Sequence, residues 1–116
     1  MKDLAILSER LRERAMVAGG DFGWPLDVAE EVIDALADAG AVVTGVEAWS
    51  VDSEGVPASV GWSCYDLGED YANDWETSIL TGRSEAKQVL AGVMETAEED
   101  EVNFVGIDWD VPGEDA

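Results

Sequence analysis

Residues 24–51 read WPLDVAEEVIDALADAGAVVTGVEAWSV, and they decide the class of fold because a helical pattern runs directly into a strand pattern. Apolar residues recur at three and four positions over residues 26–39, which predicts a helix. Pro25 suits its first turn, and Gly40 suits the position after its end. Residues 41–51 are rich in β-branched and aromatic residues and predict a strand. The predicted apolar helix face comprises Ala29, Val32, Ile33, Leu36 and Ala39.

The next segment continues the sheet. Residues 58–66, ASVGWSCYD, have strand composition, and Asp52-Ser53-Glu54-Gly55 before them is typical of a turn, so residues 41–66 predict a hairpin. Residues 67–74 predict an acidic loop. Residues 75–79 fit either a short strand or a helical turn.

The C-terminal part predicts another helix and a final strand. Ser84 can cap a helix that runs to about Glu98. Residues 102–111 alternate in polarity as a strand does. One predicted face carries Asn103, Val105, Ile107, Trp109 and Val111, and the other carries Val102, Phe104, Gly106, Asp108 and Asp110.

The N-terminal part predicts one helix over residues 2–17, with Leu4, Leu7 and Leu11 on one side and Gly19-Gly20 at its end. We expect Asp21-Phe22-Gly23 to be a turn. The chain of 116 residues is then one small α+β domain, with residues 112–116 as a short free tail. Its antiparallel sheet of three to four strands packs against about three helices, in the order α-α-β-β-(β)-α-β.

Composition argues against several classes of function. The chain has one cysteine, Cys64, and no histidine, which removes the commonest general base and the commonest transition-metal ligand. Asp108 and Asp110 begin like a calcium loop, but Pro112 interrupts the pattern and the required glutamate is missing. We therefore expect no metal, no cofactor and no enzymatic activity. Short apolar runs and the lack of a signal peptide predict a cytoplasmic protein.

Charge is the strongest functional signal. The formal net charge is −21, and four of the six basic residues lie within the first fourteen positions. Such a field repels nucleic acid and membrane surfaces and attracts cationic proteins. We therefore expect a basic protein partner, without direct binding of nucleic acid or membranes. The oligomeric state stays open.

Three groups of acidic and aromatic residues are candidates for that contact. The helix at 26–39 is expected to present a stripe of carboxylates with no basic residue to pair them, and such like-charge neighbours destabilise a helix. The segment around residues 65–76 places aromatic residues among carboxylates, as interface anchors often are. The final strand can display two more carboxylates. The candidates are Asp27, Glu30, Glu31, Asp34 and Asp38; Tyr65, Asp66, Glu69, Asp70, Tyr71, Asp74, Trp75 and Glu76; and Asp108 and Asp110.

Residues 23–49, GWPLDVAEEVIDALADAGAVVTGVEAW, resemble the immunity protein 40 family of bacterial polymorphic toxin systems. That family has a Trp-Pro motif, a helix of pattern A..AID.L...G and a glycine-containing strand that ends in an aromatic residue. VGWSCYD, residues 60–66, resembles its second strand. The matching positions are Trp24, Pro25, Ala29, Val32, Ile33, Asp34, Leu36, Gly40, Gly45, Trp49, Trp62 and Cys64. The resemblance implies a cytosolic antitoxin that binds a delivered toxin and blocks it.

Three hypotheses follow. The first is an immunity protein whose carboxylates occupy positions that nucleic-acid phosphates take in a basic toxin, possible sites being the helical stripe and the segment 66–76. The second is a phage-type nucleic-acid mimic, such as an anti-CRISPR or anti-restriction protein. The third is a domain whose acidity serves solubility in a salt-rich cell.

Overall fold

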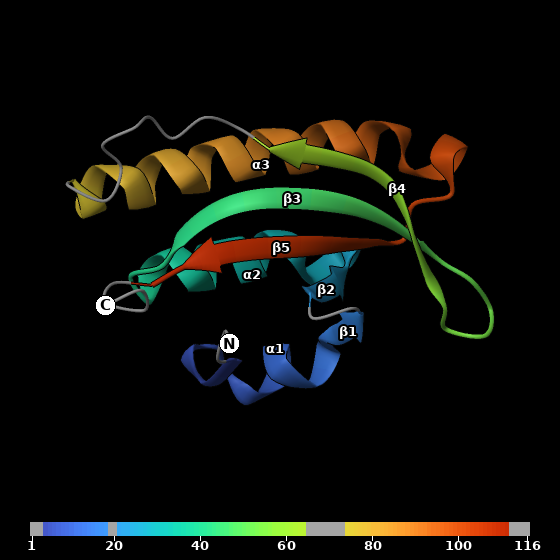
Figure 1. The fold of residues 1–116 in the computed structure, drawn as a ribbon, viewed down its shortest axis with the longest axis horizontal. Helices are drawn as coiled ribbons and strands as arrows, with labels where there is room; N and C mark the ends of the chain where they lie inside the picture. The colour runs from blue at the N-terminus through green and yellow to red at the C-terminus, as the bar shows by residue number, and fades with distance from the viewer. Residues whose placement is uncertain (1–3, 19–20, 65–73, 112–116) are drawn as a thin grey trace.

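Helices and strands form two layers, with a curved five-stranded sheet on one side and two long helices on the other (Figure 1). The structure is a computed structural model that describes residues 4–18, 21–64 and 74–111, with the backbone alone at 5, 18 and 61–64. The sheet order is β1-β2-β5-β3-β4, and all neighbours are antiparallel. The α+β class is confirmed, but the sheet has five strands rather than three to four.

The N-terminal part differs from the predicted single helix. It forms a 3-10 helix, Leu4–Ile6, and a short helix α1, Glu9–Arg14. Ser8 caps α1 by accepting a hydrogen bond from the backbone N–H of Leu11. The backbone becomes extended at Ala15, with φ −73° and ψ 141°, and strand β1, Met16–Ala18, follows. The helix prediction was therefore too long.

The segment predicted as a turn at residues 21–23 belongs to strand β2, Asp21–Pro25. It pairs with β1, where Val17 lies opposite Phe22, and with the last strand, where Trp24 lies opposite Val105. The second pairing joins residues about eighty positions apart. Local sequence patterns carry little information about such a contact, because strand formation depends strongly on tertiary context.

Helix α2, Leu26–Asp38, confirms the central prediction. Pro25 occupies the N-cap rather than the first turn, and Gly40, at φ +90°, follows the helix end in the left-handed region that glycine favours. Strands β3, Val42–Val51, and β4, Pro57–Cys64, confirm the hairpin. Its turn is held by Asp52, whose Oδ1 accepts hydrogen bonds of 2.9 Å from the backbone N–H groups of Glu54 and Val56.

Helix α3, Trp75–Asp100, is much longer than the helix predicted over 84–98. Asp74, not Ser84, is its N-cap and accepts a hydrogen bond of 3.2 Å from the backbone N–H of Thr77. Residues 75–79 are therefore helical. The extra turns lie against β3, where Gly82 comes so close that an added Cβ would be 2.6 Å from the carbonyl oxygen of Val43.

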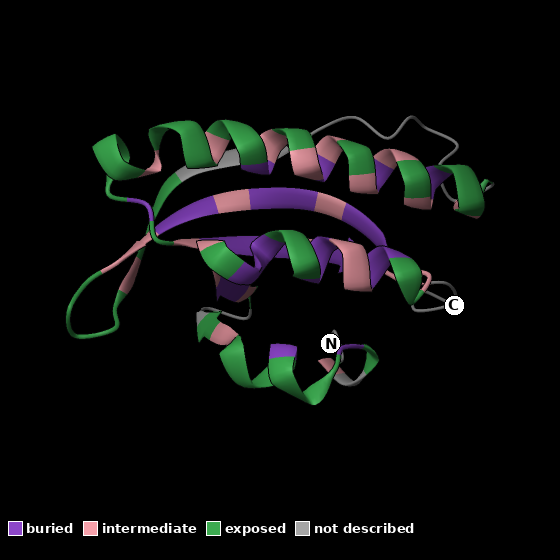
Figure 2. Cartoon of the chain, turned by 180° about the vertical axis from the view of Figure 1, so that it is seen from behind, coloured by how far each residue is buried: buried purple, intermediate pink, exposed green. Residues whose placement is uncertain are grey.

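The last strand, β5, Phe104–Asp110, lies in the middle of the sheet. Its predicted inner face is confirmed, because Val105, Ile107 and Trp109 are buried in the core. Trp109 packs beside Trp24 with ring centroids 6.2 Å apart, and the Trp24 indole N–H donates to the carbonyl oxygen of Leu11 at 2.8 Å. Burial is concentrated between the layers, while α3 stays exposed along its outer side and at its C-terminal end (Figure 2).

Candidate functional site

The five carboxylates of α2 lie together on one helix face, as predicted, but the structure pairs every one of them. Arg10 and Arg14 of α1 approach from one side, and Arg14 Nη2 lies 3.1 Å from Asp27 Oδ1. Arg83 and Lys87 of α3 approach from the other side. The pairs are Arg10–Glu31, Arg14–Asp27, Arg83–Asp34, Arg83–Asp38, Lys87–Glu30 and Lys87–Asp34.

Asp34 is the centre of this network. Its Oδ1 accepts from Arg83 Nε at 2.8 Å and lies 2.7 Å from Lys87 Nζ. Burial raises the pKa of Asp34, but the hydrogen bonds and positive charges of Lys87 and Arg83 outweigh burial and hold the pKa below its usual value. Two cations on one oxygen make this carboxylate a structural link between α2 and α3.

The expectation of an unpaired stripe was therefore wrong. The missing partners come from other helices, and only their spacing hinted at it. Arg10 and Arg14 are four residues apart, as are Asp27 and Glu31, and Arg83 and Lys87 share the spacing of Glu30 and Asp34. Residues four apart lie on the same face of a helix. Two helices that lie side by side can therefore form two ion pairs when their charged residues have this same spacing. The stripe holds the helices together, so a partner would have to compete with these contacts.

The second predicted group is only partly visible. Tyr65, Asp66, Glu69, Asp70 and Tyr71 lie outside the described residues. Asp74 serves as the cap of α3, and the Trp75 indole N–H donates to the carbonyl oxygen of Gly40 at 2.7 Å. Glu76 is exposed in the first helical turn. Asp74 and Trp75 thus fix the start of α3 against the end of α2.

Asp108 and Asp110 point to the sheet face opposite the helices, as predicted, and both are half-buried. Neither is without a partner in the molecule. The neighbouring hollow, lined by Asp21, Glu47 and Asp108, has a volume of about 10 Å³. That volume is close to one water molecule, so it is too small for a ligand.

Trp49 packs on the same face of the sheet. Its indole lies on Gly23 and Gly106, where an added Cβ would meet ring atoms at 2.3 Å and 2.7 Å. The indole N–H donates to Glu47 Oε1, and the Ser59 hydroxyl donates to Glu47 Oε2 at 2.9 Å. Both oxygens of Glu47 are thus used internally.

Five further carboxylates without an ion pair to a described residue are gathered at the C-terminal end of α3, and none of them is among the candidate residues predicted from the sequence. Glu95, Glu98, Glu99, Asp100 and Glu101 are all exposed, and none makes an ion pair with a residue that the structure describes. No basic residue follows Lys87 in the chain. Carboxylates at the negative end of a helix dipole, and three or four residues from one another, are mutually unfavourable. A signal was available in the sequence, since the last three residues of this helix and its C-cap, Glu101, are four acidic residues in a row.

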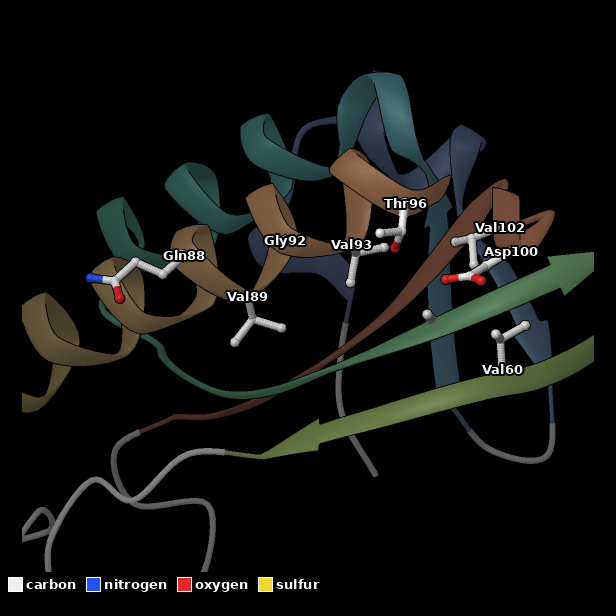
Figure 3. Close-up of a pocket in the computed structure, with 9 residues that line it drawn as sticks. Val60, Gln88, Val89, Gly92, Val93, Thr96, Asp100 and Val102 are labelled. Atoms are coloured by element: carbon white, nitrogen blue, oxygen red, sulfur yellow. The ribbon is translucent and has the colours of Figure 1, made fainter. Parts of the chain in front are cut away.

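A groove runs beside this helix end, between α3 and β4 (Figure 3). Its volume is about 340 Å³, and it is lined by apolar side chains from β3, β4 and α3 together with the polar side chains of Gln88, Thr96 and Asp100. Polar groups lie at its borders. The lining residues are Ala48, Val60, Gln88, Val89, Gly92, Val93, Thr96, Asp100 and Val102.

A second, more open hollow of about 450 Å³ adjoins the groove at Val102. It is bordered by three carboxylates, those of Asp52, Glu98 and Glu101, and by the polar side chain of Asn103. Together the two hollows present an apolar groove with an acidic end. We call this combination the α3 groove surface.

The chemical groups of the α3 groove surface are apolar side chains, carboxylates and a few polar side chains. Among the described residues, no group of three or more acidic or sulfur-bearing side chains is arranged to hold a metal ion. Within the same described part of the chain, no helix has the length and apolar character needed to cross a membrane. What the surface offers is apolar contact area and unpaired negative charge.

Comparisons of the chain with protein-family models, with curated proteins and with solved structures found no match. The resemblance to the immunity protein 40 family therefore depends on the quoted residues alone. Most of those that the structure describes in full serve the fold: Trp24, Ala29, Val32, Ile33 and Leu36 are buried in the core.

Proposed function

We propose that this protein is a cytoplasmic immunity protein that binds a basic bacterial toxin and blocks its active site. The proposal depends mainly on one observation, the unpaired carboxylates at the end of α3 beside an apolar groove. A nuclease toxin must bind phosphate and is basic at its active site, so an acidic surface matches it. The resemblance at residues 23–49 favours the same class.

The internal network at α2 strengthens the argument. Four of the six basic residues pair with the five carboxylates of that helix, so the molecule uses its few cations where they join helices. The end of α3 receives no such cation within the described chain. Charge left unpaired at a structural cost is a feature of surfaces that select a partner.

The test is neutralisation of a basic bacterial toxin, and any toxin encoded beside this protein's gene is the first one to assay. We expect co-expression to restore growth of cells that produce the toxin, and we expect a stable complex on gel filtration. If the purified protein neither binds nor inhibits the toxin, the proposal is contradicted.

The same acidic surface suits the alternative, a nucleic-acid mimic that occupies the basic cleft of a host defence complex. It requires competition with DNA or RNA for that complex. A gel-shift titration separates the two proposals, because an immunity protein inhibits its toxin and leaves the defence complex bound to nucleic acid.

A further inference from the structure

Gly92 lies in the interior of α3 with no packing contact that requires glycine. A Cβ added there would meet no heavy atom of the described residues within 4 Å. Gly82 of the same helix is different, because the backbone of Val43 excludes a Cβ. Glycine weakens a helix interior, and a frequent reason for its presence is the close approach of another backbone or a ligand. Gly92 therefore marks open space that another chain can enter.

The space beside Gly92 is the groove of Figure 3, where Val89 and Val93 point from α3 toward the strands. Val60 lies across from them on β4 and is 45% exposed. Ala48 pairs with Gly61 and Trp49 pairs with Ser59, so Val60 is the extra residue of a β-bulge. Bulges redirect side chains, and this one adds an apolar wall to the groove.

The negative charge around the groove indicates which kind of chain can bind there. Asp100 borders it, and the adjoining hollow adds Asp52, Glu98 and Glu101. A second copy of the chain is a poor occupant, because each copy carries a formal charge of −21. A cationic segment with apolar side chains matches both parts of the surface.

We propose that the α3 groove surface is the docking site for one segment of the cationic partner. An apolar side chain of that segment enters between Val60 and Gly92, and its lysine or arginine side chains reach Asp100, Glu98 and Glu101. This inference rests on the proposed function, since it assumes a basic protein partner, and it names the part of that partner that binds.

The test uses a phage-displayed library of random short peptides, selected on the full-length protein at about 150 mM salt. Two variants accompany the wild type. Gly92→Trp places an indole inside the groove, because residue 92 lines the groove and has room for a side chain. Ala91→Trp places the same side chain on the adjacent exposed position, which does not line the groove. Circular dichroism and thermal unfolding establish that both variants are folded.

We expect the selected peptides to combine apolar with basic residues. Their affinity should fall by about tenfold or more in Gly92→Trp and stay unchanged in Ala91→Trp. Peptides that bind Gly92→Trp as well as wild type would overturn the inference, and so would a selection that enriches no basic-apolar peptide.

The toxin complex separates this inference from the proposed function. If the toxin binds wild type and Gly92→Trp equally well, the proposed function is supported and docking in the groove is contradicted. If peptides bind in the groove but the protein has no effect on the co-encoded toxin, docking in the groove is supported and the proposed function is contradicted.

Discussion

Asp34 shows how single residues divide the acidic surface into structural and available parts. One of its oxygens is held by both Arg83 and Lys87, and its pKa is lowered as a result. Glu98, on the next helix, is exposed and has no cationic partner among the described residues. The same residue class thus has two roles, and the positions of the few basic residues decide which role each carboxylate has.

Asp34 predicts a specific pH dependence of stability. The pKa of Asp34 in the folded protein is below 3.8, its model value. The stabilisation from its ion pairs is therefore fully present above the pKa of the unfolded state, and it is lost as the pH falls through the lower pKa of the folded state. Asp34→Asn should reduce the free energy of unfolding by about 1 kcal/mol at neutral pH. Urea unfolding of both proteins should show the difference shrinking below about pH 4. A difference independent of pH would contradict this account.

Asn103 predicts a second effect at the residue scale. Its side-chain amide donates to the carbonyl oxygen of Val51 and accepts from the Val51 N–H, both at 2.8 Å, which extends the pairing of β3. Because the site is exposed, Asn103→Ala should cost only about 0.5–1.5 kcal/mol in denaturant unfolding. Asn103→Asp should cost more, because a carboxylate would face the Val51 carbonyl oxygen. Equal losses in the two variants would contradict the pairing.

At the scale of elements, α3 has two halves with different environments. The first half packs on β3 and supplies Arg83 and Lys87 to α2. The second half borders the groove and ends in carboxylates at its negative pole. The helix is therefore a structural element at its start and a candidate binding element at its end.

The two glycines of α3 test this division. Gly82→Ala should destabilise the protein by about 1–3 kcal/mol, because the backbone of Val43 leaves no room. Gly92→Ala should be neutral or stabilising by up to about 1 kcal/mol, because the space is open and alanine is the better helix former. Urea unfolding measures both. Similar effects of the two substitutions would show that the halves are not distinct.

The carboxylates at the helix end predict a gain in stability when they are neutralised. A triple variant with Glu98→Gln, Asp100→Asn and Glu101→Gln should unfold with a free energy about 1 kcal/mol higher at low salt, because dipole and like-charge repulsion are relieved. A charge-matched control changes Glu9, Glu13 and Glu54, all exposed, to glutamine. A loss of stability in the triple variant relative to this control would show that the helix-end carboxylates have structural partners.

At the scale of the whole molecule, the charge is divided unevenly. The basic residues lie before residue 15 or at 83 and 87, and the structure gathers four of them around α2. The remaining surface is strongly acidic, from the β3–β4 turn to the end of α3. A negative field of this kind would steer a cationic partner toward the molecule before contact is made.

Self-repulsion predicts that salt stabilises the free protein. The melting temperature should rise between about 10 mM and 500 mM sodium chloride, because screening weakens repulsion at a net charge of −21 more than it weakens the few exposed ion pairs. The rise should be smaller in the triple variant than in wild type. A melting temperature that falls with salt would mean that ion pairs outweigh repulsion.

The parts that the sequence predicts well are those specified by neighbouring residues. The helix at Leu26–Asp38, the hairpin and the inner face of β5 follow from periodicity and turn residues. The strands β1 and β2 were missed because they are stabilised by pairing with distant segments. The start of α3 was missed because Gly82 and β-branched residues weaken a helical pattern that β3 supports.

The candidate site was harder to predict for the same reason. Carboxylates are visible in a sequence, but their partners are not, because Arg14 and Arg83 reach α2 from separate helices. The groove depends on a β-bulge at Val60 and on the distance between α3 and β4, which no local pattern encodes.

The central claim is that the carboxylates at the end of α3 are kept for a cationic partner. The most direct test is the affinity of the triple variant for the basic toxin that we propose as the partner, measured by calorimetry against the charge-matched control. We predict that the triple variant binds about tenfold or more weakly than the control, although both have lost the same charge. Equal affinities would contradict the claim and leave net charge alone as the basis of binding.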